Sequence, residues 1–415
     1  MIRKWYRGAS AALVVCVATL AVLAGGATAQ PKATGSVRLF SHTGQQPALT
    51  VLLKNFQKAY PDITVNASYG PAGGGYGPVL TTTIQAGNIP DVFYGNGGTG
   101  ALESILPMAR AGKLLDLSKQ PWAKRMPAAS RDIFWIGNKL YGLQMDVSPA
   151  GLIYNETALK QLGLTAPTTY AQLKTLCKKV SAAGKIPIAF PGSSGGTAMQ
   201  LIAVSLGIDS AWNTKRLAGK TTFAGTLAWQ RAFQRLVDMR DSGCFQPGSQ
   251  TSSVPQALQL VGAGRALMLP APSAAFATIQ QLSPASTFKM LPFPGNTVKA
   301  KALVTYSDAL SVSATASDRA SSLTLVNFLA REGQSRLLAK LLGAVSIHDA
   351  NVGNLPDTMK AFTPYFKNKN TIARLSDGWP GAAVLTALNT ATSSVLSHQS
   401  SPADALKSID DAWPK

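Results

Sequence analysis

The sequence predicts an α/β fold built on two sheets, and three observations support this. Its 415 residues are enough for two domains of ordinary size. Apolar residues make up 46% of the chain and charged residues 14%, so two hydrophobic cores can be buried. Strand-like and helix-like segments alternate along the chain, and that order predicts mostly parallel sheets flanked by helices.

The first unit begins with a short apolar strand at residues 37–40. Leu49, Leu52, Phe56 and Tyr60 then recur at helical spacing, which predicts a helix with one apolar face. The remaining predicted elements of this unit are strands at 63–69 and 91–95 and helices at 79–86 and 101–111.

The second unit begins near Gly151 and repeats the pattern with more helices. The predicted strands lie at 152–154, 186–190, 266–269 and 309–313, and the predicted helices at 156–162, 169–183, 199–206, 227–242, 320–329, 382–398 and 403–411. Open α/β sheets bind ligands beyond the carboxyl ends of their strands. The loops after residues 40, 69, 95, 190 and 269 are therefore expected to hold the site.

The amino-terminal segment has the three parts of a secretory signal peptide. Basic residues at the start are followed by an apolar stretch at 11–24, which is too short to span a bilayer. Small residues at 27–29 fit a cleavage site, so we predict a signal peptide over residues 1–29 that is cleaved near Ala29. A permanent amino-terminal anchor is the alternative. The processed protein is expected to be periplasmic.

The cysteines agree with export. Cys16 lies in the signal segment and lacks the small residues that precede a lipoprotein cysteine, which favours a free periplasmic protein. Cys177 and Cys244 remain after processing, and such a pair can form one disulfide in an oxidising compartment. Two buried thiols are the alternative.

The chain is strongly basic, with a formal net charge of +20. Such a charge is compatible with nucleic acid, an anionic membrane or an anionic ligand. The basic residues are scattered singly or in pairs, without a polybasic block or a recognisable nucleic-acid-binding module. We therefore expect a solvated basic surface and no nucleic-acid partner, with a negatively charged solute as an alternative.

Two short motifs could indicate an enzyme. Residues 95–100 match G-x-G-x-x-G, and residues 192–196 match G-x-S-x-G, each between a strand and a helix. The first follows the third strand of its unit, which favours a glycine-rich ligand loop over a dinucleotide site. The second would make Ser194 a nucleophile, but only His348 and His398 follow it in the sequence to take its proton. A periplasmic serine hydrolase using Ser194 is the alternative of another class.

Signatures of metals and cofactors are lacking in the sequence. It contains no HExxH or CxxC motif and no histidine cluster, so we expect neither a metal nor a cofactor. Asp91, Asp146, Asp308 and Asp377 could supply a pair of glycosidase carboxylates, although Asp91 is equally suited to a turn or a cap. We therefore predict a binding protein rather than an enzyme.

A series of motifs follows in order along the processed chain. The first unit contains FQKAYPDITV at 56–65, IQAGNIPDVF at 84–93 and GKLLDL at 112–117. The most specific piece is NKLYGLQMDVSPAGLIYNETALKQLGL at 138–164, and GAGRALM follows at 262–268. Together they resemble the sugar-type extracellular solute-binding proteins, the maltose-binding-like family 1, over essentially the whole processed chain.

The resemblance implies a two-lobed periplasmic-binding-protein fold that closes by a hinge around a solute. It places the N-terminal lobe at 36–148 plus 309–343 and the C-terminal lobe at 149–302 plus 347–415. It further implies the substrate-binding subunit of an ABC importer. Such a subunit captures a sugar, oligosaccharide or polyol and delivers it to the transmembrane permease subunits. We expect a monomer.

Two loops depart from the family pattern. Residues 41–46 carry no acidic residue after the first strand, and residues 270–274 carry no tryptophan. Both departures argue against an aromatic ring that stacks on a sugar at these loops, and they predict a less acidic cleft. Such a cleft would suit an anionic solute such as a glycerol phosphate, which is the main variant of the prediction.

The chemistry of sugars selects the candidate contacts. Amides and hydroxyls pair with sugar hydroxyl groups, and an aromatic face covers the apolar C–H side. The predicted ligand contacts are Gln45, Tyr76, Asn96, Gly97, Asp146, Ser148, Ser193, Ser194, Ser273, Tyr306, Asp308 and Trp379. Tyr76 and Trp379 could equally be packed aromatic residues. His42 lies near the same cleft but is not among the predicted contacts.

Overall fold

The computed structural model describes residues 34–72, 75–127, 130–295, 301–306, 308–350 and 352–414. The predicted signal peptide, its cleavage near Ala29 and Cys16 lie outside these residues. Across the described part of the chain, no helix combines the length and apolar character needed to cross a membrane.

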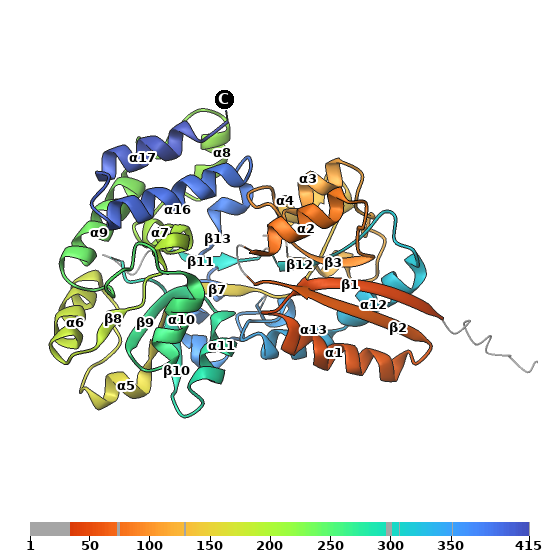
Figure 1. The fold of residues 1–415 in the computed structure, drawn as a ribbon, viewed down its shortest axis with the longest axis horizontal. Helices are drawn as coiled ribbons and strands as arrows, with labels where there is room; N and C mark the ends of the chain where they lie inside the picture. The colour runs from red at the N-terminus through yellow and green to blue at the C-terminus, as the bar shows by residue number, and fades with distance from the viewer. Residues whose placement is uncertain are drawn as a thin grey trace, which may run out of the picture. The chain divides into compact units, whose positions relative to one another are not determined.

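The first sheet runs in the order β2-β1-β3-β12-β6 (Figure 1). Its strands are β1 (Gly35–His42), β2 (Ile63–Gly70), β3 (Val92–Asn96), β6 (Leu143–Gln144) and β12 (Asp308–Val312). The helices with it are α1 (Gln46–Ala59), α2 (Tyr76–Gln85), α3 (Ile105–Arg110), α4 (Arg131–Phe134), α12 (Arg319–Leu329) and α13 (Glu332–Leu341). We call this sheet and its helices lobe one.

Helix α1 shows how the sequence forms these elements. A proline stands in its first turn, where the missing N–H removes no intrahelical bond. Leu49, Leu52 and Phe56 lie on one face and are fully buried, as their spacing predicts. The helix therefore covers the sheet with its apolar face and leaves its polar face to solvent.

The second sheet runs in the order β13-β11-β7-β9-β8, with β10 also paired to β7. Its strands are β7 (Ser148–Asn155), β8 (Ile186–Ile188), β9 (Ala266–Pro272), β10 (Phe288–Leu291), β11 (Ala302–Thr305) and β13 (Thr371–Ala373). The helices with it are α5 (Glu156–Gln161), α6 (Tyr170–Ala182), α7 (Gly196–Ser205), α8 (Trp212–Leu217), α9 (Leu227–Asp241), α10 (Val254–Gly262), α11 (Ala275–Leu282), α16 (Ala382–Leu396) and α17 (Pro402–Asp411). We call this sheet and its helices lobe two.

Shorter elements complete the described chain. The hairpin β4 (Trp135–Ile136) and β5 (Lys139–Leu140) leads to β6, and α14 (Ile347–Ala350) and α15 (Thr363–Lys367) precede β13. Thr169 caps α6, since its side chain accepts a hydrogen bond from the backbone N–H of Gln172.

Two stretches cross directly between the sheets without a helix, namely β6 to β7 and β11 to β12. One carries the chain from lobe one to lobe two and the other returns it. For that reason β12 pairs antiparallel with β6, and β11 antiparallel with β7. An isolated bridge between Val147 and Val345 marks a third crossing.

The predicted α/β fold with two helix-flanked sheets is confirmed, but the sheets are mixed rather than mostly parallel. In lobe one, β1 pairs in parallel with β2 and β3. In lobe two, β9, β10 and β11 all run antiparallel to β7. Parallel pairing needs a long crossover connection. The strands that cross directly between the sheets have no such connection, so they pair antiparallel. The alternation of strands and helices in the sequence could not indicate their direction.

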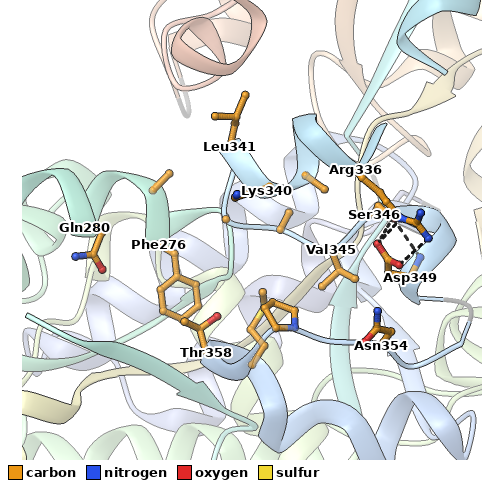
Figure 2. A pocket seen from close by; sticks show the side chains of 16 residues that line it. Phe276, Gln280, Arg336, Lys340, Leu341, Val345, Ser346, Asp349, Asn354 and Thr358 are labelled. Atoms are coloured by element: carbon orange, nitrogen blue, oxygen red, sulfur yellow. Dashed lines mark hydrogen bonds and ion pairs between the residues drawn. The ribbon is translucent and has the colours of Figure 1, made fainter. Parts of the chain in front are cut away.

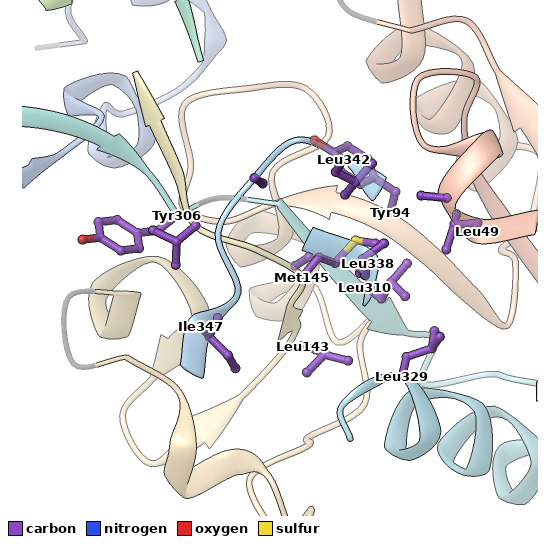
Figure 3. Packing of buried hydrophobic residues seen from close by; sticks show 14 of the residues in the cluster. Leu49, Tyr94, Leu143, Met145, Tyr306, Leu310, Leu329, Leu338, Leu342 and Ile347 are labelled. Atoms are coloured by element: carbon purple, nitrogen blue, oxygen red, sulfur yellow. The ribbon is translucent and has the colours of Figure 1, made fainter. Parts of the chain in front are cut away.

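The hydrophobic packing continues through the crossing. Figure 3 shows part of one cluster, in which Met145 and Leu310 from the crossing stretches lie near Leu338 of α13. A second cluster fills lobe two and includes Cys177 of α6 and Cys244, which the structure joins in a disulfide. The bond ties α6 to the segment that follows α9.

Candidate functional site

A cavity of about 310 Å³ lies between the lobes, and we call it the cleft cavity. Its walls come from the loop after β1, the start of β12, the segment between β8 and α7, the end of β9, and helices α10 and α11. The polar residues that line it are His42, Gln45, Ser194, Thr197, Thr278 and Asp308. The loops after β1, β8 and β9 were three of the predicted positions for a ligand.

Gln45 brings an unused hydrogen-bond donor to this cavity. The residue immediately precedes α1 and is 1% exposed. Its Oε1 accepts a hydrogen bond from Ser41 Oγ at 3.0 Å, whereas its Nε2 has no partner. A buried donor without a partner costs about 1–3 kcal/mol. A ligand acceptor in the cavity would remove that cost.

His42 faces the same space and adds a second unpartnered atom, Nδ1. Burial lowers the pKa of His42, although the charge of Asp308 acts in the opposite direction. The ring is therefore neutral at pH 7 and offers one donor and one acceptor nitrogen. Its edge packs against the ring of Tyr94, with the ring centres 4.6 Å apart. The sequence prediction had set His42 aside, and only its place after the first strand could have identified it.

Asp308 is the carboxylate of the cavity, and a polar network holds it from behind. Tyr94 Oη lies 3.0 Å from Asp308 Oδ1 and 2.7 Å from Asn96 Oδ1. The amide of Asn96 in turn donates to Glu103 Oε1 at 2.7 Å. These contacts fix the Asp308 side chain, and its position next to the cavity lets it accept hydrogen bonds from a solute.

Asp146 interacts electrostatically with Asp308 but does not line the cavity. It is 1% exposed, and its Oδ2 has no hydrogen-bond partner. Burial and the charge of Asp308 raise the pKa of Asp146 well above its usual value. The less acidic cleft stays a prediction, and Asp308 is the one acidic side chain among the described residues that line the cavity.

Three of the predicted contacts line the cleft cavity: Gln45, Ser194 and Asp308. Asn96 and Asp146 belong to the polar groups around Asp308 but do not line the cavity. Sequence reasoning missed Thr197 and Thr278, because the helices that present them carry no ligand signal of their own. The apolar lining consists of aliphatic residues and prolines, and among the described lining residues the ring of His42 is the one aromatic group.

The predicted serine contacts of lobe two are mostly engaged within the protein. Ser148 and Ser273 hydrogen-bond each other across β7 and β9, with 3.1 Å between their hydroxyl oxygens. Both are buried. Ser193 donates its hydroxyl to the carbonyl of Ser252 at 2.9 Å. These three residues hold the cavity wall together and do not line the cavity.

The predicted aromatic contacts are core residues. Trp379 is fully buried among Trp212, Phe223 and Trp413, and its Nε1 donates to Asn213 Oδ1 at 3.2 Å. The expectation that Trp379 provides a sugar platform is therefore wrong, because no face of its ring is free.

Three further predicted contacts lie in packed surroundings. Tyr76 is 1% exposed and donates to the carbonyl of Tyr94 at 2.9 Å. Tyr306 belongs to the hydrophobic cluster of Figure 3. Gly97 has Ile133 against the position where a side chain would begin. None of Tyr76, Tyr306 and Gly97 lines the cleft cavity.

The geometry for a serine hydrolase is not present in the described part of the chain. Ser194 lines the cavity, but its hydroxyl makes no hydrogen bond to a histidine among the described residues. His348 and His398, the candidate bases, do not line the cavity. Nor do the described residues contain a cluster of histidine, cysteine and acidic side chains that could hold a metal ion.

A second cavity of about 390 Å³ lies between α11 and α13 (Figure 2). Its charged side chains at one end are paired with each other. Arg336 donates to both carboxylate oxygens of Asp349, and Ser346 also donates to Asp349. Because these groups already have partners, this cavity is a weaker candidate than the cleft cavity.

Comparison with known sequences places this geometry in a family. The family described as "Bacterial extracellular solute-binding protein" matches residues 41–335. The "Multiple sugar-binding protein" of Streptococcus mutans is 24% identical over 260 residues, which cover 60% of this chain and 59% of that protein. A "Probable sugar-binding periplasmic protein" of Mesorhizobium japonicum is 29% identical over 174 residues, which cover 39% of each chain.

Solved structures share the fold at low sequence identity. A structure described as "SBP RafE in complex with raffinose" has a TM-score of 0.76 at 19% identity, over 91% of this chain and 98% of that one. A "Chitin oligosaccharide binding protein" has a TM-score of 0.74 at 19% identity, over 90% and 97% of the two chains. These similarities support the two-lobed fold that the sequence predicts.

Proposed function

Since the chain belongs to the bacterial extracellular solute-binding proteins, we propose that it is the substrate-binding subunit of an ABC importer. In this proposal it captures a sugar or a polyol in the cleft cavity and delivers it to permease subunits in the membrane. The observation that carries the proposal is the interlobe cavity with unpartnered polar atoms on Gln45 and His42 and the carboxylate of Asp308. Such groups match the alternating donors and acceptors of sugar hydroxyls.

Capture would proceed by closure of the lobes around the solute. Lobe one contributes His42, Gln45 and Asp308 to the cavity, and lobe two contributes Ser194, Thr197 and Thr278. A solute that contacts both walls stabilises the closed arrangement relative to the open one. The crossing stretches between the sheets would serve as the hinge, with lobe boundaries at 36–148 plus 309–343 and 149–302 plus 347–415.

The remaining proposals concern the context of the protein. We infer export to the periplasm with cleavage near Ala29, action as a monomer, and recognition of the closed form by the permease. The names of the relatives support the sugar as the solute class. An anionic solute is not favoured, because Asp308 lines the cavity whereas none of the described lining residues is a lysine or an arginine.

The test is a thermal-shift screen of the purified protein against monosaccharides, oligosaccharides, polyols and sugar phosphates. A ligand at a hundredfold excess over its Kd stabilises the folded state by about 2.7 kcal/mol. A clear rise in melting temperature with neutral sugars or polyols is expected. A rise with sugar phosphates alone would contradict the solute class, and no rise with any compound, from a folded and ligand-free sample, would contradict the proposal.

A further inference from the structure

The glycine-rich loop at residues 95–100 makes a direct contact between the lobes. Its Thr99 N–H donates to the carbonyl of Asp377 at 2.9 Å, and Thr99 Oγ1 donates to the carbonyl of Trp379 at 2.5 Å. The partner segment, residues 376–379, follows β13 in lobe two. We call residues 98–100 together with residues 376–379 the interlobe contact.

The contact is too close to admit any side chain at Gly98 or Gly100. A Cβ at Gly98 would lie 1.9 Å from the carbonyl oxygen of Asp377, and one at Gly100 would lie 1.8 Å from that of Ser376. Both distances are far shorter than a van der Waals contact of about 3.5 Å. The two glycines therefore allow the backbones of the two lobes to touch directly.

The interlobe contact adjoins a third cavity, which also lies between the lobes. A cavity of about 780 Å³ is lined on one side by Gly98 and Thr99 and on the other by Arg374 and Asp377. The cleft cavity, by contrast, is bounded by Asp308, which the Tyr94 hydroxyl links to Asn96, two residues before Gly98. The polar network that borders the cleft cavity and the interlobe contact that borders the larger cavity are therefore joined by the short segment from Asn96 to Gly98.

This partition bears on the size of the solute. The cleft cavity, at about 310 Å³, is at the small end of the range of roughly 300–1,000 Å³ for ligand pockets. A saccharide of several rings would need space beyond this cavity, and the larger cavity adjoins the interlobe contact. We propose that residues 98–100 and 376–379 close this side of the cleft and limit the solute to a saccharide of one or two rings, or a polyol of similar size. The inference rests on the proposed function.

Titration calorimetry with saccharides of increasing length tests the limit. The probes are glucose, maltose, maltotriose and maltotetraose, together with the corresponding xylose and galactose series. Within the series that binds, the one- or two-ring member is expected to bind at least tenfold more tightly than members of three rings or more. Equal or tighter binding of a three-ring member would overturn the inference while leaving the proposed function intact. Absence of binding by every saccharide and polyol would overturn both.

Two pairs of variants test whether the interlobe contact sets the limit. Gly100→Ala introduces the clash with Ser376, and Gly333→Ala is its control, because a Cβ at Gly333 meets nothing within 4 Å. Gly98→Ala combines its clash with backbone strain, because Gly98 has a left-handed φ of +84° that alanine rarely adopts. Gly207→Ala is its control, since Gly207 has a similar φ of +83° and a Cβ there meets nothing within 4 Å. Only the Gly100 and Gly98 variants should reduce the preference for the short saccharide, by at least tenfold. A preference equal to that of the wild type in both would overturn the inference.

A gentler variant covers the case in which the glycine variants fail to fold. Thr99→Val removes the hydrogen bond to the Trp379 carbonyl without adding a clash. It is expected to reduce the preference for the short saccharide about threefold and to enlarge the radius of gyration of the ligand-free protein in X-ray scattering. An unchanged preference together with an unchanged radius would also contradict the role of the contact.

Discussion

Two segments that the sequence offered as ligand contacts, the loop after β1 and the segment around Trp379, differ in the side chains that were predicted to bind sugar. At the first, Gln45 Nε2 and His42 Nδ1 are buried beside a cavity without partners. At the second, the indole N–H of Trp379 has a partner, and its carbonyl accepts a hydrogen bond from Thr99. Residue type suggested that both segments bind sugar. The difference teaches that a residue type suited to sugar is available to a solute only where packing leaves its polar atom without a partner, as at Gln45 and not at Trp379.

The largest expected effect is a loss of stability on truncating Trp379, and its absence would contradict the assignment of this residue to the core. Trp379→Ala should reduce the free energy of unfolding by about 3–5 kcal/mol, because it leaves a large cavity in the core of lobe two. Trp135→Ala, at a half-buried position, should cost clearly less. Urea denaturation measures both. A Trp379→Ala protein of normal stability that no longer binds sugar would show that the ring is a platform after all.

Asp308→Asn is expected to weaken solute binding by about 10- to 100-fold, because a hydrogen bond to a charged group contributes about 1.5–3 kcal/mol. Calorimetry with the solute found in the thermal-shift screen provides the measurement. Asp357→Asn is the matched control, since that side chain is 91% exposed and lies outside the cleft cavity. Equal losses in the two variants, or no loss in either, would contradict the role assigned to Asp308.

The third prediction concerns pH and stability. The raised pKa of Asp146 means that its contribution to stability is complete below its usual value of 3.8 and is lost as pH rises through its folded-state pKa. Asp146→Asn removes this loss of stability at high pH, because an amide does not ionise. The variant should therefore be more stable than the wild type by about 1–3 kcal/mol at pH 8, the usual cost of an unsatisfied buried group, with the gain vanishing near pH 3.5. Urea denaturation at both pH values checks this, and a gain independent of pH would refute the electrostatic cause.

The smallest expected effect is a loss of solute affinity on removing one donor atom, Gln45 Nε2. Gln45→Ala should weaken solute binding by about 3- to 10-fold, the contribution of one neutral hydrogen bond. It should change the melting temperature of the ligand-free protein little, because removal of the unpartnered donor is offset by loss of the acceptor for the buried Ser41 hydroxyl. Gln57→Ala, on the exposed side of α1, should change neither quantity. A lower melting temperature without loss of affinity would assign Gln45 to folding instead.

The fold was largely predictable because its determinants are local. The spacing of Leu49, Leu52 and Phe56 specifies the buried face of α1, and the Thr169 cap specifies the start of α6. The direction of the crossing strands was not predictable, since it depends on which sheet the chain enters next. Periodicity within a segment carries no such information.

The site was predictable in position but only partly in composition. The rule that ligands bind beyond strand ends pointed to Gln45 and Ser194, and Asp308 was chosen for its hydrogen-bonding chemistry. Trp379 and Tyr76 were assigned by residue type, and packing overrides type, because partners distant in sequence bury their rings. Thr197 and Thr278 were missed because only the tertiary arrangement turns these helix residues towards a common cavity.

The return of the chain from β11 to β12 has a consequence for biosynthesis. The sheet of lobe one takes its fourth strand in spatial order, β12, from Asp308–Val312, whereas β1, β2 and β3 lie before residue 97. During synthesis, β3 therefore keeps an open edge until roughly three quarters of the polypeptide has emerged. The sheet of lobe one can therefore be completed only late in synthesis. The same interleaving means that no single cut in the chain yields either lobe intact.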